Sequence, residues 1–155
     1  MPRPPTSPCL PIWALFRSFV GITLVFGIGL YYSLVYAYYE TTDGLSEITV
    51  QDREIAISDY IGIDATSSGL KLRGCFTVKP SDFDGLALGV DAVPLSAPKW
   101  FDCYNVGDIH QDIEAGRAIA YLAAENEKGG IDRIVAVYPD GRAFQWRQLN
   151  EKYQD

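Results

Sequence analysis

The chain has 155 residues, 48% of them hydrophobic, which suits one domain with a packed core plus one appended element and excludes a second large domain. Its formal net charge is −7. Residues 1–39 contribute only two of the 13 basic side chains and none of the 20 acidic ones, so residues 40–155 carry a net charge of −9. An acidic domain is poorly suited to nucleic acid, and we expect no nucleic-acid partner.

The first 39 residues predict a tail and a membrane span. Residues 1–17 are rich in proline and predict a disordered cytoplasmic tail. Residues 18–39 carry no charged side chain, and as a helix they would extend about 33 Å, against a hydrocarbon thickness of about 30 Å. Gly27 and Gly29 do not form a dinucleotide-binding loop, because Tyr32 occupies the place of the third glycine. We therefore predict a transmembrane helix over residues 18–39.

The same segment raises a choice between a retained anchor and a cleaved signal. Small residues at Val35 and Ala37 would allow cleavage after Ala37, which would leave a secreted soluble protein. Against this, the apolar run exceeds the roughly 7 to 15 residues of a signal peptide. It also ends in tyrosines, whose amphipathic rings favour the lipid–water boundary. We predict a retained anchor in a lipid bilayer, with an interface belt of Tyr31, Tyr32, Tyr36, Tyr38 and Tyr39.

The flanking charges predict the orientation of this helix. Arg3 and Arg17 precede it, and the first charged residues after it are Glu40, Asp43 and Glu47. Because basic residues near a span stay on the cytoplasmic side, the N-terminus should be cytoplasmic. We therefore expect a protein of the bacterial inner membrane with residues 40–155 in the periplasm.

Small residues on the helix suggest a membrane-protein partner. Gly29, Ser33 and Ala37 recur every four residues, a spacing that lets two helices approach closely. In an alternative that stays open, Arg17 snorkels, the helix begins near Trp13, and the tyrosines form an ordinary belt.

The remaining chain predicts an α+β domain over residues 40–155. After a polar hinge, "ETTDGLS", we predict a strand over residues 71–78 and a helix that begins at the N-cap Asn105 and ends at Gly116. Strands follow over residues 117–126, 131–139 and 142–149, the last two joined by the turn Pro139-Asp140-Gly141. The expected fold is one small antiparallel sheet with one or two short helices, and residues 81–90 fit either a short helix or a loop and strand.

Few residues carry recognisable chemistry. His110 is the only histidine, which excludes a histidine-based triad or a multi-histidine metal site. Asp82, Asp84 and Gly85 resemble a calcium loop, but its later ligand positions are apolar, so we interpret them as a turn. We expect no cofactor, no metal and no enzymatic activity, with catalysis by carboxylates alone as an alternative. Four aromatic residues either line a pocket or pack in the core, namely Trp100, Phe101, Tyr104 and Trp146.

Several runs together resemble a known family: "GLYYSLVYAYYE", "GIDATSS", "LRGCFT", "APKWFDC" and "GIDRIVAVYPDGRAFQW". They are similar, over residues 21–150, to an uncharacterised bacterial family of small single-pass membrane proteins with a domain of unknown function. The resemblance implies no activity, cofactor or catalytic residue. Some members are labelled histidine kinases, but this chain has no phosphoacceptor box and no Gly-rich nucleotide-binding segment.

The cysteines fit the predicted topology. Cys9 precedes the helix, in the reducing cytoplasm, whereas Cys75 and Cys103 follow it, where an oxidising periplasm permits a disulfide. Two buried thiols are the alternative. We hypothesise an accessory or interaction subunit, with a periplasmic sensor or small-ligand-binding module as the alternative.

Overall fold

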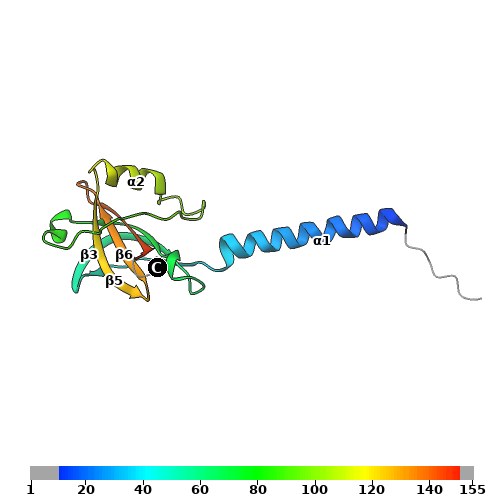
Figure 1. Ribbon diagram of the computed structural model, residues 1–155, viewed down its shortest axis with the longest axis horizontal. Helices are drawn as coiled ribbons and strands as arrows, with labels where there is room; N and C mark the ends of the chain where they lie inside the picture. The colour runs from blue at the N-terminus through cyan, green and yellow to red at the C-terminus, as the bar shows by residue number, and fades with distance from the viewer. Residues whose placement is uncertain (1–10, 151–155) are drawn as a thin grey trace, which may run out of the picture. The chain divides into compact units, whose positions relative to one another are not determined.

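The computed structural model describes residues 11–150 and divides the chain into two units, residues 1–37 and 38–155 (Figure 1). The first unit contains the helix α1 (Ile12–Tyr32), which continues as one π-helical turn over Ser33–Ala37. Together they form the one candidate membrane span within the described residues, and none of its residues is buried. By length and composition this segment is suited to a membrane anchor or a signal sequence.

The helix begins and ends earlier than the absence of charge predicted. It starts directly after Pro11, whose carbonyl accepts a hydrogen bond from the Ala14 amide at 2.8 Å. Arg17 lies inside it and stacks over the Trp13 ring at 5.7 Å, so this one charge does not end the helix. The start near Trp13 agrees with the alternative in which Arg17 snorkels. At the other end the helix stops at Ala37, two residues before the predicted boundary.

The predicted tyrosine belt is therefore divided between the two units. Tyr36 lies against the rings of Tyr31 and Tyr32, with centroid distances of 6.3 Å and 5.9 Å. Tyr38 and Tyr39, in contrast, lie beyond the helix in the second unit. The Tyr39 ring packs against Trp100 at 5.8 Å and Lys71 at 4.7 Å there. Only three of the five predicted belt residues thus lie on the helix.

The π-helical turn contains two of the three small residues in the predicted stripe, Ser33 and Ala37. The Ser33 amide donates to the Gly29 carbonyl, so these two residues stack on one helical face. Ala37 ends the π-helical turn, whose hydrogen bonds span five residues rather than four.

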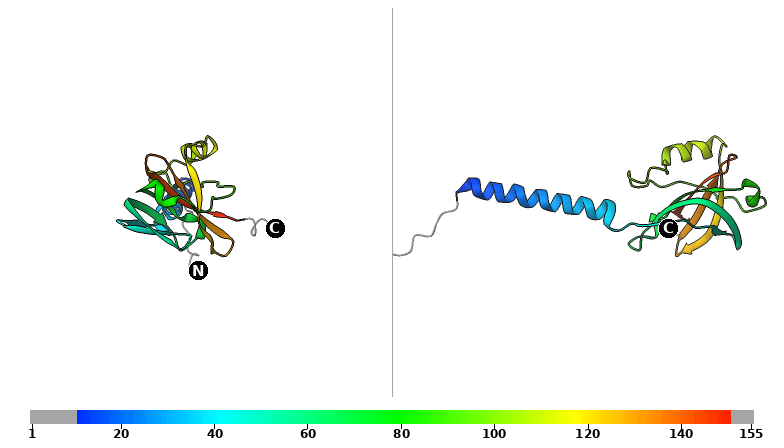
Figure 2. Two further views of the ribbon diagram at one scale, coloured as in Figure 1. Left: turned by 90° about the vertical axis from the view of Figure 1, so that its left-hand side faces the viewer. Right: turned by 180° about the vertical axis from the view of Figure 1, so that it is seen from behind.

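The second unit is built on a seven-stranded antiparallel sheet (Figures 1 and 2), which confirms the predicted α+β class. Its path runs β1-β3-β4-β7-β6-β5, and β2 pairs with β3 beside that path. One α-helix accompanies it, α2 (Val106–Glu114). The strands are β1 (Glu40–Asp43), β2 (Glu47–Val50), β3 (Arg53–Asp64), β4 (Arg73–Val78), β5 (Ile119–Lys128), β6 (Ile131–Val137) and β7 (Arg142–Leu149).

The predicted C-terminal meander and its helix are confirmed. The Asn105 side chain accepts hydrogen bonds from the Gly107 and Asp108 amides, which caps α2. Gly116 and Gly141 have φ angles of +70° and +93°, so the chain turns at both glycines. The predicted strand over residues 71–78 begins two residues late, because Gly69–Lys71 forms a 3-10 turn.

The N-terminal half of the sheet was not predicted. The proposed polar hinge is wrong, because its first four residues form β1 and pair with the end of β3. All four residues of β1 are exposed, so they show no apolar alternation. β3 has 12 residues, and its pairing with β4 shifts register between Ser58 and Ile61. This bulge lets one strand pair with β1, β2 and β4.

Both faces of the sheet are buried over its centre. On β6, Val135 and Val137 pack with one hydrophobic cluster, whereas Ile134 and Ala136 pack with another. The second cluster contains Trp146 and residues of the segment before α2. The sheet is curved (Figure 2). The backbone amide of Gln51 donates to the Ala123 carbonyl at 2.8 Å, and this bond links the β2–β3 turn to β5. The second face carries the candidate site.

Gly62 on β3 is expected not to tolerate a side chain. An added Cβ would stand 2.7 Å from Cε1 of Tyr60, which is buried and accepts a hydrogen bond from Gln145 at 2.8 Å. Gly62→Ala should therefore lower the free energy of unfolding of the full chain by about 1 to 3 kcal/mol, the typical cost of overpacking. Denaturant titration measures this. Gly129→Ala is the control because its Cβ would contact nothing; equal losses in both variants would contradict the packing.

Candidate ligand-binding site

A segment without regular helix or strand, residues 86–96, covers part of the second face; we call it the 86–96 loop. It pairs with β5 through two backbone hydrogen bonds. The Gly89 amide donates to the Ala120 carbonyl at 2.9 Å, and the Leu122 amide donates to the Ala87 carbonyl at 3.1 Å. A Cβ on Gly89 would meet Ile134 at 3.1 Å, so glycine allows this close approach. The loop is therefore joined to the sheet by backbone hydrogen bonds.

Two glutamine side chains fix the loop further. Gln51 exchanges two hydrogen bonds of 3.0 Å with the backbone of Ala87. The buried Gln148 amide donates to the Asp91 carbonyl at 3.0 Å and accepts from the Val93 amide at 2.9 Å. Trp146 donates to the same Gln148 oxygen at 3.0 Å and so fixes its orientation. These contacts give the loop a defined shape.

Arg73 holds the end of the loop. Its guanidinium donates to the carbonyls of Leu95 and Ser96, at 2.9 and 3.1 Å, and to Leu70 at 2.7 Å. Arg73 is 5% exposed and lies 5.9 Å from the Tyr104 ring. Burial lowers the pKa of Arg73 and raises the pKa of Tyr104, because both charged forms lose hydration. Carbonyl oxygens from two segments thus solvate one buried cation.

Between the loop and strands β5, β6 and β7 lies a pocket of about 680 Å³. This volume is within the usual range for small-molecule sites, about 300 to 1,000 Å³. Leu88 and Val90 are 60% and 76% exposed, so apolar surface is open to solvent at the pocket. Its lining residues are Leu70, Leu88, Val90, Asp91, Val93, Leu95, Leu122, Glu125, Asp132, Ile134, Gln148, Leu149 and Asn150.

The charged side chains in this lining are all acidic, namely Asp91, Glu125 and Asp132. Oδ1 of Asp132 accepts hydrogen bonds from the Asn126 amide at 2.7 Å and from the Asn150 side chain at 2.9 Å. The buried Oδ1 of Asn150 has no hydrogen-bond donor in the structure. The pocket therefore combines apolar walls with carboxylates.

The aromatic pocket considered from the sequence is not this pocket. Phe101, Tyr104 and Trp146 are buried in the hydrophobic cluster of the second face. Trp100 packs at the margin of that cluster and does not line the pocket. Sequence reasoning missed the 86–96 loop as a wall; its signal is the run "LALGVDAVPL", in which apolar residues alternate irregularly with Gly, Asp and Pro.

The other residues considered from the sequence lie on the surface. His110 is 47% exposed and lies 3.4 Å from Glu114 on α2. Asp82 belongs to the 3-10 turn Pro80–Phe83, and the Arg53 guanidinium donates to the carbonyls of Asp82 and Asp84. This arrangement agrees with a turn. Within residues 11–150, no group of three His, Cys, Asp or Glu side chains is placed to hold a metal ion.

A charged cluster lies around Arg147. Its guanidinium donates to Asp64 at 2.8 Å and to Glu127 at 2.6 Å. Burial by itself would lower the pKa of Arg147, but the hydrogen bonds to Glu127 and Asp64 outweigh it and raise that pKa. Arg133 lies 2.9 Å from the same Glu127. These charges are mutually paired, and we assign them a structural role.

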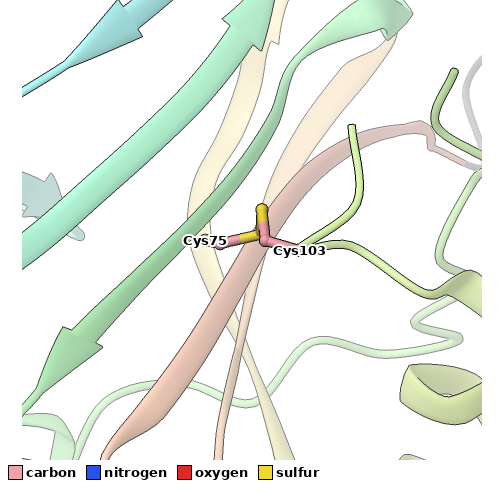
Figure 3. The surroundings of a disulfide bond; sticks show 2 residues. All are labelled: Cys75 and Cys103. Carbon is pink, nitrogen blue, oxygen red and sulfur yellow. A yellow bond between two sulfur atoms is a disulfide. The ribbon is translucent and has the colours of Figure 1, made fainter. Parts of the chain in front are cut away.

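A disulfide joins Cys75 on β4 to Cys103, just before α2 (Figure 3). The two Cα atoms are 6.3 Å apart, within the usual range for a disulfide. Cys75 belongs to the hydrophobic cluster with Trp146 and Ile109, so the bond ties the entry of α2 to the sheet. Cys9 lies outside the described residues.

Residues 44–155 match a family model described as "Family of unknown function (DUF6446)". No curated protein and no solved structure matches the chain. The resemblance to a domain of unknown function is thereby confirmed for the second unit, while the α1 helix precedes the matched range. Because the match covers more than half of the chain, the protein belongs to the DUF6446 family, a family of unknown function.

Proposed function

We propose that the chain is a single-pass protein of the bacterial inner membrane that presents its acidic domain to the periplasm and acts there as an accessory or interaction subunit. The observation that carries this proposal is the disulfide that follows a candidate membrane span. Structural disulfides persist in oxidising compartments and are rare in the cytosol. The positive-inside rule also supports a periplasmic domain. Arg17 lies near the N-terminal end of the helix, and the first charged residues after the helix, Glu40 and Asp43, are acidic.

A second candidate function is a small-ligand-binding module. The pocket of about 680 Å³ under the 86–96 loop favours it, because its apolar lining and fixed polar groups are typical of ligand sites. The two functions are compatible, since a ligand-bound domain can also be a subunit. They differ in what co-purifies with the protein: a partner protein for the subunit role, and a small molecule for the ligand-binding role.

The subunit role predicts that the helix contacts a partner through Gly29. In Gly29→Leu, the large side chain should separate the helices and reduce recovery of a partner from mild detergent at least about fivefold, the effect of roughly 1 kcal/mol. Gly27→Leu is the matched control, because residues two apart do not share a helical face. A Cβ on either glycine would contact nothing within its own chain.

Quantitative mass spectrometry of the purified protein measures this recovery. The subunit proposal expects one recurrent membrane protein with the natural chain and with Gly27→Leu, but not with Gly29→Leu. A lone monomer in all three preparations would contradict the subunit role, and equal loss in both variants would contradict the contact at Gly29.

A further inference from the structure

We propose that the pocket under the 86–96 loop binds a small apolar molecule that carries one ammonium or guanidinium group. The proposal rests on the ligand-binding function described above and not on the accessory role. Its evidence is the lining of the pocket, the sign of the charge there, and the way the loop is held.

The apolar part of the ligand is inferred from the walls. Leucine, isoleucine and valine side chains form most of the lining, from Leu70 on one side to Leu122 and Ile134 on the sheet. Val90 and Leu88 lie largely in solvent. A ligand that covers them would gain a favourable free energy of roughly 25 cal/mol for each Å² of apolar surface removed from water. An alkyl or aryl group matches this surface, and the volume of about 680 Å³ is suited to a small molecule.

The cationic group is inferred from the charges. Asp91, Glu125 and Asp132 line the pocket, and no lysine or arginine is among its lining residues in the described chain. An anionic ligand would meet three like charges, whereas these charges attract an ammonium or guanidinium group. The pocket therefore discriminates by charge.

The loop is already held in the shape that forms the wall. Three side chains hydrogen-bond its backbone. Gln51 bonds to Ala87, and Gln148 bonds to Asp91 and Val93. Arg73 bonds to Leu95 and Ser96. A site fixed before binding does not lose conformational entropy of the loop when the ligand enters. The structure thus favours binding without rearrangement of the pocket.

Three probes of one size test the ligand class: 4-phenylbutylamine, 4-phenylbutanol and 4-phenylbutyrate. The full chain in nanodiscs of zwitterionic lipid is titrated by calorimetry, with empty nanodiscs as the blank. We expect the amine to bind about tenfold more tightly than the alcohol, the alcohol more tightly than the carboxylate, and added salt to reduce this selectivity.

A pair of double variants locates the selectivity. Glu125→Gln with Asp132→Asn keeps the side-chain shapes and should lower amine affinity about tenfold, and alcohol affinity much less. Glu47→Gln with Glu54→Gln removes the same number of charges from exposed positions outside the pocket and should change neither. Binding of none of the probes would overturn the ligand-binding function itself. Equal binding of amine and alcohol, or unchanged amine affinity in the pocket variant, would overturn the cationic ligand class alone.

Discussion

Replacing Cys75 or Cys103 by alanine is expected to lower the free energy of unfolding of the second unit by about 3 to 4 kcal/mol. The bond joins residues 28 apart, and opening this loop raises the conformational entropy of the unfolded chain. For a domain of ordinary stability, about 5 to 15 kcal/mol, this is a large share. The steady-state level of either variant in cells should therefore fall.

Denaturant titration of the full chain measures this loss. The double variant Cys75→Ala with Cys103→Ala should be little worse than either single variant, because each single change already removes the bond. Reductant should bring the natural chain to a similar stability. Two outcomes would show that packing rather than the bond accounts for the effect: additive losses of unfolding free energy in the double variant, or a natural chain whose unfolding free energy does not change with reductant.

Arg73→Met is expected to cost about 3 kcal/mol of unfolding free energy and to loosen the 86–96 loop. The substitution keeps the apolar stem but leaves the carbonyls of Leu70, Leu95 and Ser96 without their charged donor. A fully buried acceptor left unsatisfied costs about 1 to 3 kcal/mol; these three carbonyls are part-buried, so each contributes less, and loss of the buried charge offsets part of the sum.

Hydrogen exchange of the full chain separates the two effects. In Arg73→Met, amides of the loop, including Val93, should lose protection more than amides of β6. Arg73→Lys should recover only part of the stability, because an ammonium group cannot reproduce the planar donor fork. A uniform loss of protection, with no excess in the loop, would contradict the role of Arg73 in holding the pocket wall.

The part of the fold that could be predicted from sequence is the part with strong local signals. Asn105 and Gly116 bracket α2, and Pro139-Asp140-Gly141 marks the hairpin between β6 and β7. β1 gave no such signal, because its side chains are all exposed and it joins the sheet by pairing with β3. β3 was missed because its bulge at residues 58–61 interrupts the period of two.

The candidate site depends on contacts between residues far apart in the chain. Gln148 meets Asp91 across 57 positions, and Gln51 meets Leu122 across 71. Neither glutamine belongs to a recognisable motif. The aromatic residues, which are conspicuous in the sequence, pack in the core instead, whereas the pocket is lined by leucine and valine from an irregular loop. Local pattern carries no information about such pairings.

A pair of reporter fusions after Asp155 tests the proposed location of the domain most directly. The account places the N-terminus in the cytoplasm and an anchor at Ile12–Ala37, so alkaline phosphatase fused there should be active and green fluorescent protein should be dark. The phosphatase fusion should also sediment with the membranes. Its intact mass should include the residues before Ala37. A fluorescent, phosphatase-inactive pair would contradict the periplasmic location, and an active fusion released in soluble form would contradict the membrane anchor.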